Sequence, residues 1–366
     1  MNRKERRTLA KSQEKTKKSI AGAKAGEVNS AVENVISRAI KAAQLGALDE
    51  AESALLEAEK VAPAHPEIKH QLGMLMARTG RLDQGIAYLT AACHARPSEA
   101  LYWNNLCAAY MSAGRSVDAA DASRKATEID PNYAMAFYNL GVTLREINRP
   151  IEAVAALRRL TELTPGDPAA WNMLGVNLVA TGDKIQALDA LAKCVTLDGR
   201  NVDARINLGR LLLERGDHAD ALSHFQVATE REPENYRAVL GLGIAAHELG
   251  QTNVALRALK RATSIDPRSV DAWVFLAETA DRAGEEVTAR MATERAVALA
   301  GTDARVRALA DRVLLGAGRV QIMVGDAPGP KVVGAVPAQA SAPVPAPAPA
   351  ADPAAGLPKL NIIKIN

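Results

Sequence analysis

The sequence repeats itself every 34 residues over most of its length. Proline recurs at this spacing, and the two gaps in its series, positions 199 and 301, both hold glycine. A second series in the same frame holds glycine at seven of its eight positions and asparagine, Asn148, at the other. A fixed period of this length is typical of repeat architectures, in which each unit packs on its neighbours along the chain. The prolines are Pro63, Pro97, Pro131, Pro165, Pro233 and Pro267, and the glycines are Gly46, Gly80, Gly114, Gly182, Gly216, Gly250 and Gly284.

Each repeat is predicted to consist of two helices. In one unit Trp103, Leu106 and Tyr110 have the i, i+3, i+7 spacing of one helix face. Gly114 is expected to end this helix, because glycine adopts the left-handed backbone conformation of a helix C-terminus at little cost, as asparagine does at Asn148. A second helix follows and is predicted to stop at Pro131.

The composition indicates helices that pack closely. Residues of the hydrophobic set make up 48% of the chain but aromatic residues only 3%. An all-β fold is therefore unlikely, because strands favour aromatic and β-branched side chains. Small residues recur at one position of each helix in a unit, such as Gly175 and Ala187. We therefore expect the two helices of a unit to approach backbone to backbone.

The repeat resembles the tetratricopeptide repeat. That family's pattern of Trp, Leu-Gly, Tyr, Ala, Phe, Ala and Pro is matched by Trp103, Leu106, Cys107, Tyr110, Ala119, Ser123, Ala126 and Pro131, and by Trp171, Leu174, Gly175, Leu178, Ala187, Leu191, Cys194 and Gly199. Eight units fit without insertion. The resemblance implies an all-α fold, a right-handed α-solenoid of helix-turn-helix repeats. The composition of the two chain ends predicts disordered N- and C-terminal tails.

The chain is predicted to have five segments. Residues 1–31 form a basic arm, disordered or partly helical, and residues 32–303 form eight repeats. A capping helix at 304–316 is followed by a Pro/Ala-rich linker at 317–358, which cannot build a core. Residues 359–366 form a short apolar C-terminal motif, KLNIIKIN, which we predict to dock either on a partner or on this protein's own groove. The alternative is a chain end without a binding role.

The basic arm has two interpretations. Residues 1–31 carry nine Lys or Arg and three Glu, a formal charge of +6 in a chain whose total is +3. Such a segment is either a solvated, disordered tail or makes weak contact with nucleic acid or anionic lipid through residues 1–24. It has no aromatic residue for base stacking and no apolar stripe for membrane insertion.

The resemblance also implies a binding surface. In this family the first helix of each unit lines a concave groove that binds a peptide or a partner protein, and some relatives use a ladder of asparagines there. A side-chain amide can pair with the backbone of an extended peptide without selecting its side chains. The alternative is that these amides bridge adjacent helices or cap local backbone. The candidate peptide-binding residues are Gln71, Asn104, Asn105, Tyr138, Asn139, Arg145, Asn172, Asn207 and Arg210.

The two arginines of this set have a further alternative. Arg145 and Arg210 could each hold a carboxylate of a ligand. A surface arginine more often pairs with a neighbouring acid, and Glu146 and Glu214 are close in sequence.

No enzyme signature is present. The sequence has no phosphate loop, GxSxG, HExxH or paired CxxC motif, so we expect no catalytic residue, no metal site and no cofactor. Cys93, Cys107 and Cys194 fit a reducing compartment, and Cys107 and Cys194 occupy packing positions typical of buried structural thiols. There is no signal-peptide core and no long apolar run, so a cytoplasmic location is expected.

The sequence therefore predicts a non-enzymatic scaffold or adaptor that binds an unidentified protein or peptide. Two alternatives stay open: a nucleic-acid or anionic-surface binder that acts through the basic arm, and an accessory factor for a secretion, glycosylation or envelope assembly system. The MNRKERR start resembles that of some bacterial repeat proteins, which is a hint of bacterial origin.

Overall fold

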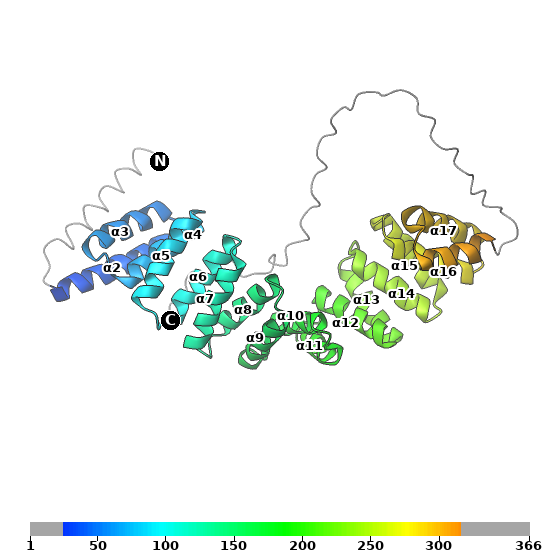
Figure 1. Ribbon diagram of the computed structural model, residues 1–366, viewed down its shortest axis with the longest axis horizontal. Helices are drawn as coiled ribbons and strands as arrows, with labels where there is room; N and C mark the ends of the chain where they lie inside the picture. Colours follow the sequence, from blue (N-terminus) through cyan, green and yellow to red (C-terminus); the bar gives the residue numbers. More distant parts are fainter. Residues whose placement is uncertain (1–24, 316–366) are drawn as a thin grey trace, which may run out of the picture. The chain divides into compact units, whose positions relative to one another are not determined.

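The computed structural model describes residues 25–315. These residues form 17 α-helices and a final π-helical turn, without a strand among them, so the predicted all-α repeat fold is confirmed (Figure 1). Most of the predicted basic arm, the Pro/Ala-rich linker and the KLNIIKIN motif lie outside the described residues. The helices belong to two compact units, which we call unit 1 (described residues 25–204) and unit 2 (described residues 205–315).

Unit 1 contains five helix pairs, and in each pair the second helix packs against the first. The pairs are α2 (Ala25–Gln44) with α3 (Leu48–Val61), α4 (Pro66–Arg78) with α5 (Leu82–Ala95), α6 (Ala100–Ser112) with α7 (Ser116–Ile129), α8 (Ala134–Glu146) with α9 (Pro150–Leu163), and α10 (Pro168–Ala180) with α11 (Lys184–Leu197).

Unit 2 continues the same pattern from within α12 (Val202–Arg215), whose residues from Arg205 onward belong to it. The remaining helices are α13 (His218–Arg231), α14 (Tyr236–Glu248), α15 (Thr252–Ile265), α16 (Val270–Arg282), α17 (Glu286–Ala300) and α18 (Ala304–Ala310), and the π-helical turn spans Asp311–Leu315. Helix α18 packs against α16 and α17 and buries Val306 and Leu309.

The turn between the two helices of a repeat has the predicted left-handed residue. All seven glycines of the series have positive φ, and Asn148, with φ 57°, is the one other described residue that does. At Gly182 the backbone N–H bonds to the carbonyl of Val179, and the next N–H, of Asp183, bonds back to Leu178. This hydrogen-bond pattern closes the C-terminus of a helix and needs a left-handed residue, which explains why glycine or asparagine recurs there.

In the repeats that contain tryptophan, a hydrogen bond joins the tryptophan to a proline of the series. The indole Nε1 of each tryptophan donates a hydrogen bond to the carbonyl of the proline six residues earlier, at 2.9 to 3.0 Å. The hydrogen bond therefore joins the loop that precedes a repeat to the first helix of that repeat. The pairs are Trp103 with Pro97, Trp171 with Pro165, and Trp273 with Pro267.

The small residues of the first helix allow the second helix to pack closely against it. In the second repeat a Cβ added at Gly73 would lie 2.9 Å from the backbone oxygen of Gly85, so these two helices do meet backbone to backbone, as predicted. A large side chain of the second helix lies nearest to the glycine in this repeat, where Leu89 Cγ would be 2.7 Å from the added Cβ, and also in four later repeats. The later pairs are Gly141 with Leu157, Gly175 with Leu191, Gly209 with Phe225, and Gly243 with Leu259.

The three cysteines are buried and unpaired. Burial raises the pKa of the Cys93 thiol to about 12, of Cys107 to about 12 and of Cys194 to about 11. The thiols therefore stay protonated at neutral pH and act as small apolar groups.

Candidate functional site

The predicted site residues divide between the two units. Seven lie in unit 1, on the first helices of successive pairs, and two lie on α12 in unit 2. Those in unit 1 are Gln71 on α4, Asn104 and Asn105 on α6, Tyr138, Asn139 and Arg145 on α8, and Asn172 on α10; those in unit 2 are Asn207 and Arg210.

A polar cluster joins α4 to α6 in unit 1, and we call it the Glu67 cluster (Glu67, His70, Gln71, Tyr102 and Asn105). The Glu67 carboxylate accepts hydrogen bonds from the Gln71 amide at 2.7 Å and from the Tyr102 hydroxyl at 2.6 Å. The His70 Nδ1 lies 3.5 Å from the same carboxylate, and its Nε2 lies 2.8 Å from Asn105 Nδ2. The His70 ring is buried and stacks on Tyr102, with ring centroids 4.3 Å apart. The cluster therefore holds one carboxylate and one imidazole in fixed positions.

The carboxylate of the cluster is held in its ionised form. Burial is the largest influence and raises the pKa of Glu67, but hydrogen bonds from His70, Tyr102 and Gln71, with the nearby imidazole, lower it from 4.5 to about 2. Burial beside this carboxylate, which accepts the phenol's hydrogen bond, raises the pKa of Tyr102. At neutral pH the cluster thus contains a carboxylate anion beside a protonated phenol.

A second polar contact joins α6 to α8. Asn139 Nδ2 donates to Asn104 Oδ1 at 2.8 Å, and the two side chains are only 9% and 5% exposed. Both this bond and the Asn105–His70 contact join residues 35 apart in sequence. The amides of Asn105 and Asn139 therefore bridge adjacent helices, as the alternative interpretation describes, while their Oδ1 atoms make no hydrogen bond to the described residues.

Three further predicted residues of unit 1 lie on α8 and α10. The Oδ1 of Asn172 is buried and has no hydrogen-bond partner among the described residues. Tyr138 is half-buried, and burial raises the pKa of its phenol. Arg145 is half-buried, and Glu146 accepts a hydrogen bond from Ser116 at 2.9 Å rather than from this arginine.

Two exposed apolar side chains accompany the amides. Leu101 on α6 and Met135 on α8 are each 40% exposed and hold the same position in consecutive repeats, in the first turn of the first helix. Large apolar side chains exposed on these helices are available to contact apolar groups of another molecule.

The predicted residues of unit 2 are engaged with neighbouring charges. Asn207 Oδ1 accepts a hydrogen bond from Arg237 at 2.9 Å, and Arg210 pairs with Glu214 at 3.1 Å, as the sequence suggested. Neither residue is brought together with the Glu67 cluster within one unit.

Unit 2 contains a pocket that the sequence did not indicate. It has a volume of about 440 Å³ and lies where α14, α16 and the C-terminal helical segment meet. Three arginines and three acids line it, so its charges balance. Phe275 is its main apolar group, and its position in the eighth repeat is the one that holds amides in earlier repeats. The lining residues are His247, Glu248, Phe275, Glu278, Asp281, Arg282, Arg305 and Arg312.

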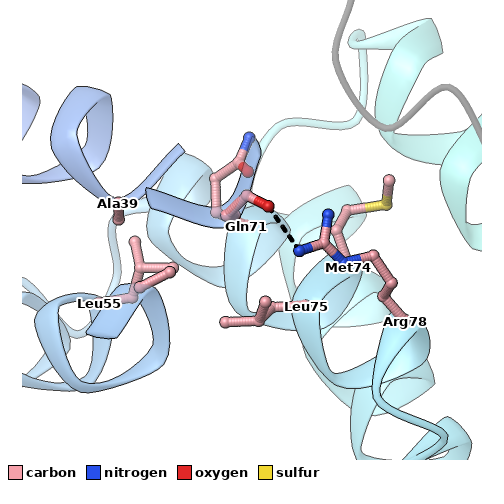
Figure 2. A pocket seen from close by; sticks show the side chains of 8 residues that line it. Ala39, Leu55, Gln71, Met74, Leu75 and Arg78 are labelled. Atoms are coloured by element: carbon pink, nitrogen blue, oxygen red, sulfur yellow. Dashed lines mark hydrogen bonds between the residues drawn. The ribbon is translucent and has the colours of Figure 1, made fainter. Parts of the chain in front are cut away.

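The pocket next to Gln71 is too small for a ligand group. Figure 2 shows Gln71 and Arg78 of α4 beside Ala39 and Leu55, and the volume is only about 10 Å³, close to that of one water molecule. The Arg78 guanidinium donates to the carbonyl of Ala43 at 2.7 Å and so joins α4 to α2. The surface of unit 1 therefore offers side chains along helices rather than an enclosed cavity.

Within residues 25–315, no three His, Cys, Asp or Glu side chains are placed to hold a metal ion together. In the same part of the chain, no helix combines the length and apolar character that a membrane crossing requires.

Sequence reasoning missed Glu67 and His70. Their repeat has Lys69 in place of the usual aromatic residue, so the family pattern draws attention away from it. A search for polar pairs 35 residues apart would have found His70 with Asn105 and Asn104 with Asn139.

Comparison with known families identifies the repeat. A family model for the tetratricopeptide repeat matches residues 36–100, 70–134, 172–236, 206–252 and 240–304, and a second model of the same description matches residues 123–155. Together the matches cover well over half of the chain. No curated protein matched the chain.

Several solved structures are similar to the chain. YrrB, described as "a TPR protein with an unusual peptide-binding site", is 26% identical with a TM-score of 0.46, over 50% of this chain and 95% of YrrB. The MamA protein is 24% identical with a TM-score of 0.43, over 46% of this chain and 92% of MamA. The pilF protein of Pseudomonas aeruginosa is 21% identical with a TM-score of 0.49, over 58% of this chain and 97% of pilF.

Proposed function

The chain belongs to the tetratricopeptide repeat family, and from this premise we propose that it is a non-enzymatic scaffold whose unit 1 binds an extended segment of a partner protein. Repeats of this family generally serve as surfaces for protein interaction. The binding surface consists of the first helices of unit 1, α4, α6, α8 and α10, which carry the amides described above.

One observation supports this proposal more than any other. Leu101 and Met135 recur on consecutive repeats, beside amide groups whose carbonyl oxygens have no internal partner. An extended peptide supplies backbone N–H groups for such oxygens and side chains for the apolar positions. An isolated apolar pair or an isolated amide would not match both parts of a peptide.

The experiment removes the apolar contacts and leaves the fold intact. A Leu101→Ser/Met135→Ser variant is compared with an Ile151→Ser/Ile185→Ser control in the same unit, whose side chains, on α9 and α11, are 78% and 77% exposed. Each full-length variant is crosslinked in its native cell, and the captured proteins are quantified by mass spectrometry. We expect the first variant to lose specific partners and the control to keep them.

Equal capture by both variants and the unmodified protein would refute a binding role for this surface. The alternative of binding through residues 1–24 makes a different prediction, because contacts to nucleic acid or anionic lipid weaken steeply as salt rises. In pull-downs from lysate without crosslinking, capture that disappears between about 50 and 200 mM salt and survives the Leu101→Ser/Met135→Ser change would favour the arm.

We further propose that the protein works in the cytoplasm. Three buried thiols without a disulfide fit a reducing compartment. A role as accessory factor for secretion, glycosylation or envelope assembly is compatible with a cytoplasmic scaffold and is decided by the identity of the captured partners.

A further inference from the structure

The Glu67 carboxylate sets the orientation of the Gln71 amide. An ionised carboxylate accepts hydrogen bonds and donates none. The atom of Gln71 that lies 2.7 Å from it must therefore be the Nε2 donor, and rotation of the amide by half a turn would place two oxygens against each other. The Oε1 of Gln71 is consequently left for another partner.

The same carboxylate favours one tautomer of His70. Nδ1 faces the Glu67 oxygen at 3.5 Å, so a proton on Nδ1 is favoured and Nε2 keeps its lone pair. Gln71 Nε2 also lies 3.5 Å from Nδ1, but it already donates to Glu67 at 2.7 Å. The lone pair on Nε2 then accepts from Asn105 Nδ2 at 2.8 Å, which leaves Asn105 Oδ1 without a partner.

The amides of unit 1 therefore keep their carbonyl oxygens available as acceptors, beside the second N–H of each amide nitrogen. The Nδ2 or Nε2 groups of Gln71, Asn105 and Asn139 donate inside the protein, and their carbonyl oxygens make no hydrogen bond to the described residues. The side chain of Asn139 is nine-tenths buried, and Asn172 Oδ1 is buried without a partner. Carbonyl oxygens without an internal donor are free to accept N–H groups of a ligand.

Charge adds a second preference at the α2–α4 end of the surface. Glu67 is ionised and has no lysine or arginine partner among the described residues. Glu33 holds the equivalent position on α2, its side chain is 65% exposed, and its described partner is His65 at 3.6 Å. Two carboxylates at the same position of adjacent repeats, with histidines but no lysine or arginine as their partners among the described residues, attract a positive group.

We propose that Glu67 is a positioning residue that leaves the carbonyl oxygens of Gln71 and Asn105 to accept hydrogen bonds from a ligand, and that this ligand is an extended peptide with a lysine or arginine side chain at the α2–α4 end. This inference rests on the proposed function and specifies the ligand. The Glu67 carboxylate, which can only accept hydrogen bonds, sets the orientation of the Gln71, His70 and Asn105 side chains. A Glu67 with a purely structural role would not need to fix these three orientations.

The tautomer is tested on the unmodified full chain. Nitrogen-15 NMR distinguishes a histidine protonated on Nδ1 from one protonated on Nε2, and a His70→Asn variant assigns the signal. We expect His70 to carry its proton on Nδ1 at pH 7.5. A proton on Nε2 would mean that Asn105 presents a donor, and it would overturn the proposal.

The ligand preference is tested on an array of ten-residue synthetic peptides that differ at one position, occupied by Lys, Arg, Gln or Glu. The unmodified chain is expected to bind the Lys and Arg peptides about tenfold better than the Glu peptides, as one charge-assisted hydrogen bond allows. Glu67→Gln, whose amide can also donate, should reduce this ratio to about one. The matched control is Glu128→Gln on α7, which is exposed and removes the same charge from the same unit, and it should leave the ratio unchanged.

The outcomes separate the inference from the function on which it rests. If Leu101→Ser/Met135→Ser abolishes peptide binding but the array shows no preference for cations, the surface binds peptides and the inference is wrong. If that variant changes no binding at all, the proposed function itself fails. The NMR measurement and the array on the unmodified chain decide the inference even where Glu67→Gln does not fold.

Discussion

The effect of Gly175→Ala on the free energy of unfolding should depend on which residue occupies position 191. A Cβ at Gly175 would lie 2.6 Å from Cγ and 2.8 Å from Cδ2 of Leu191, closer than side-chain carbons approach in proteins. Leu191 is fully buried, so the neighbouring helices must shift to make room. Such overpacking costs about 1 to 3 kcal/mol, and the higher helix propensity of alanine returns about 1 kcal/mol. We expect a net destabilisation of up to about 2 kcal/mol.

In a Leu191→Ala background the sign should reverse. This change removes the two carbon atoms that the new methyl group meets, at a cost of about 2 to 5 kcal/mol by itself. Gly175→Ala then keeps only its propensity advantage and stabilises by about 1 kcal/mol. The coupling between the two positions is therefore about 1 to 3 kcal/mol.

The control is Gly182→Ala in the same repeat. Nothing lies within 4 Å of its added Cβ, but its φ of +83° strains any other residue. The expected cost of about 1 to 2 kcal/mol arises in the backbone, so it should be the same in both backgrounds.

Hydrogen exchange read by mass spectrometry on peptides from α10 and α11 is the suitable assay, because repeats open locally and need not unfold in one step. The free energy of local opening is measured for the two single variants, the double variant and the control. An equal effect of Gly175→Ala in both backgrounds would refute the packing interpretation.

Three other predictions follow from local features. Asn148→Gly should leave stability within about 0.5 kcal/mol of the unmodified protein, and Asn148→Ala should destabilise by about 1 kcal/mol in thermal unfolding, because φ is 57° at this residue. At pH 8 the native protein should react with fewer than one equivalent of a thiol reagent and the denatured protein with three, because Cys93, Cys107 and Cys194 are buried and their pKa values are raised. Rapid reaction of the native protein would contradict this prediction. The pKa of Glu67 is lowered from 4.5 to about 2, which stabilises the fold by up to about 3 kcal/mol above pH 4.5, and this stabilisation is lost as the pH falls toward 2. Glu67→Gln should therefore flatten the acid side of the profile of unfolding free energy against pH. Parallel profiles of the variant and the unmodified protein would contradict this prediction.

The sequence determined the elements that depend on local rules. The period of 34, the helix pairs and the left-handed turn residue follow from residue type and spacing, and the exception at Asn148 obeys the same backbone rule as the glycines. The burial of Cys107 and Cys194 also followed from their position in the repeat. Such features are readable because each depends on a few neighbouring residues and recurs eight times.

The tertiary structure decided which polar atoms remain available. The amides at Asn105 and Asn139 were recognised in the sequence, but their hydrogen bonds to His70 and Asn104 depend on how neighbouring repeats pack. Glu67 was not recognised at all, because its contacts come from a tyrosine in the next repeat and from its own helix. The sequence determined where the repeats and their amides stand, and only packing between repeats decided which ends of those amides are left to bind.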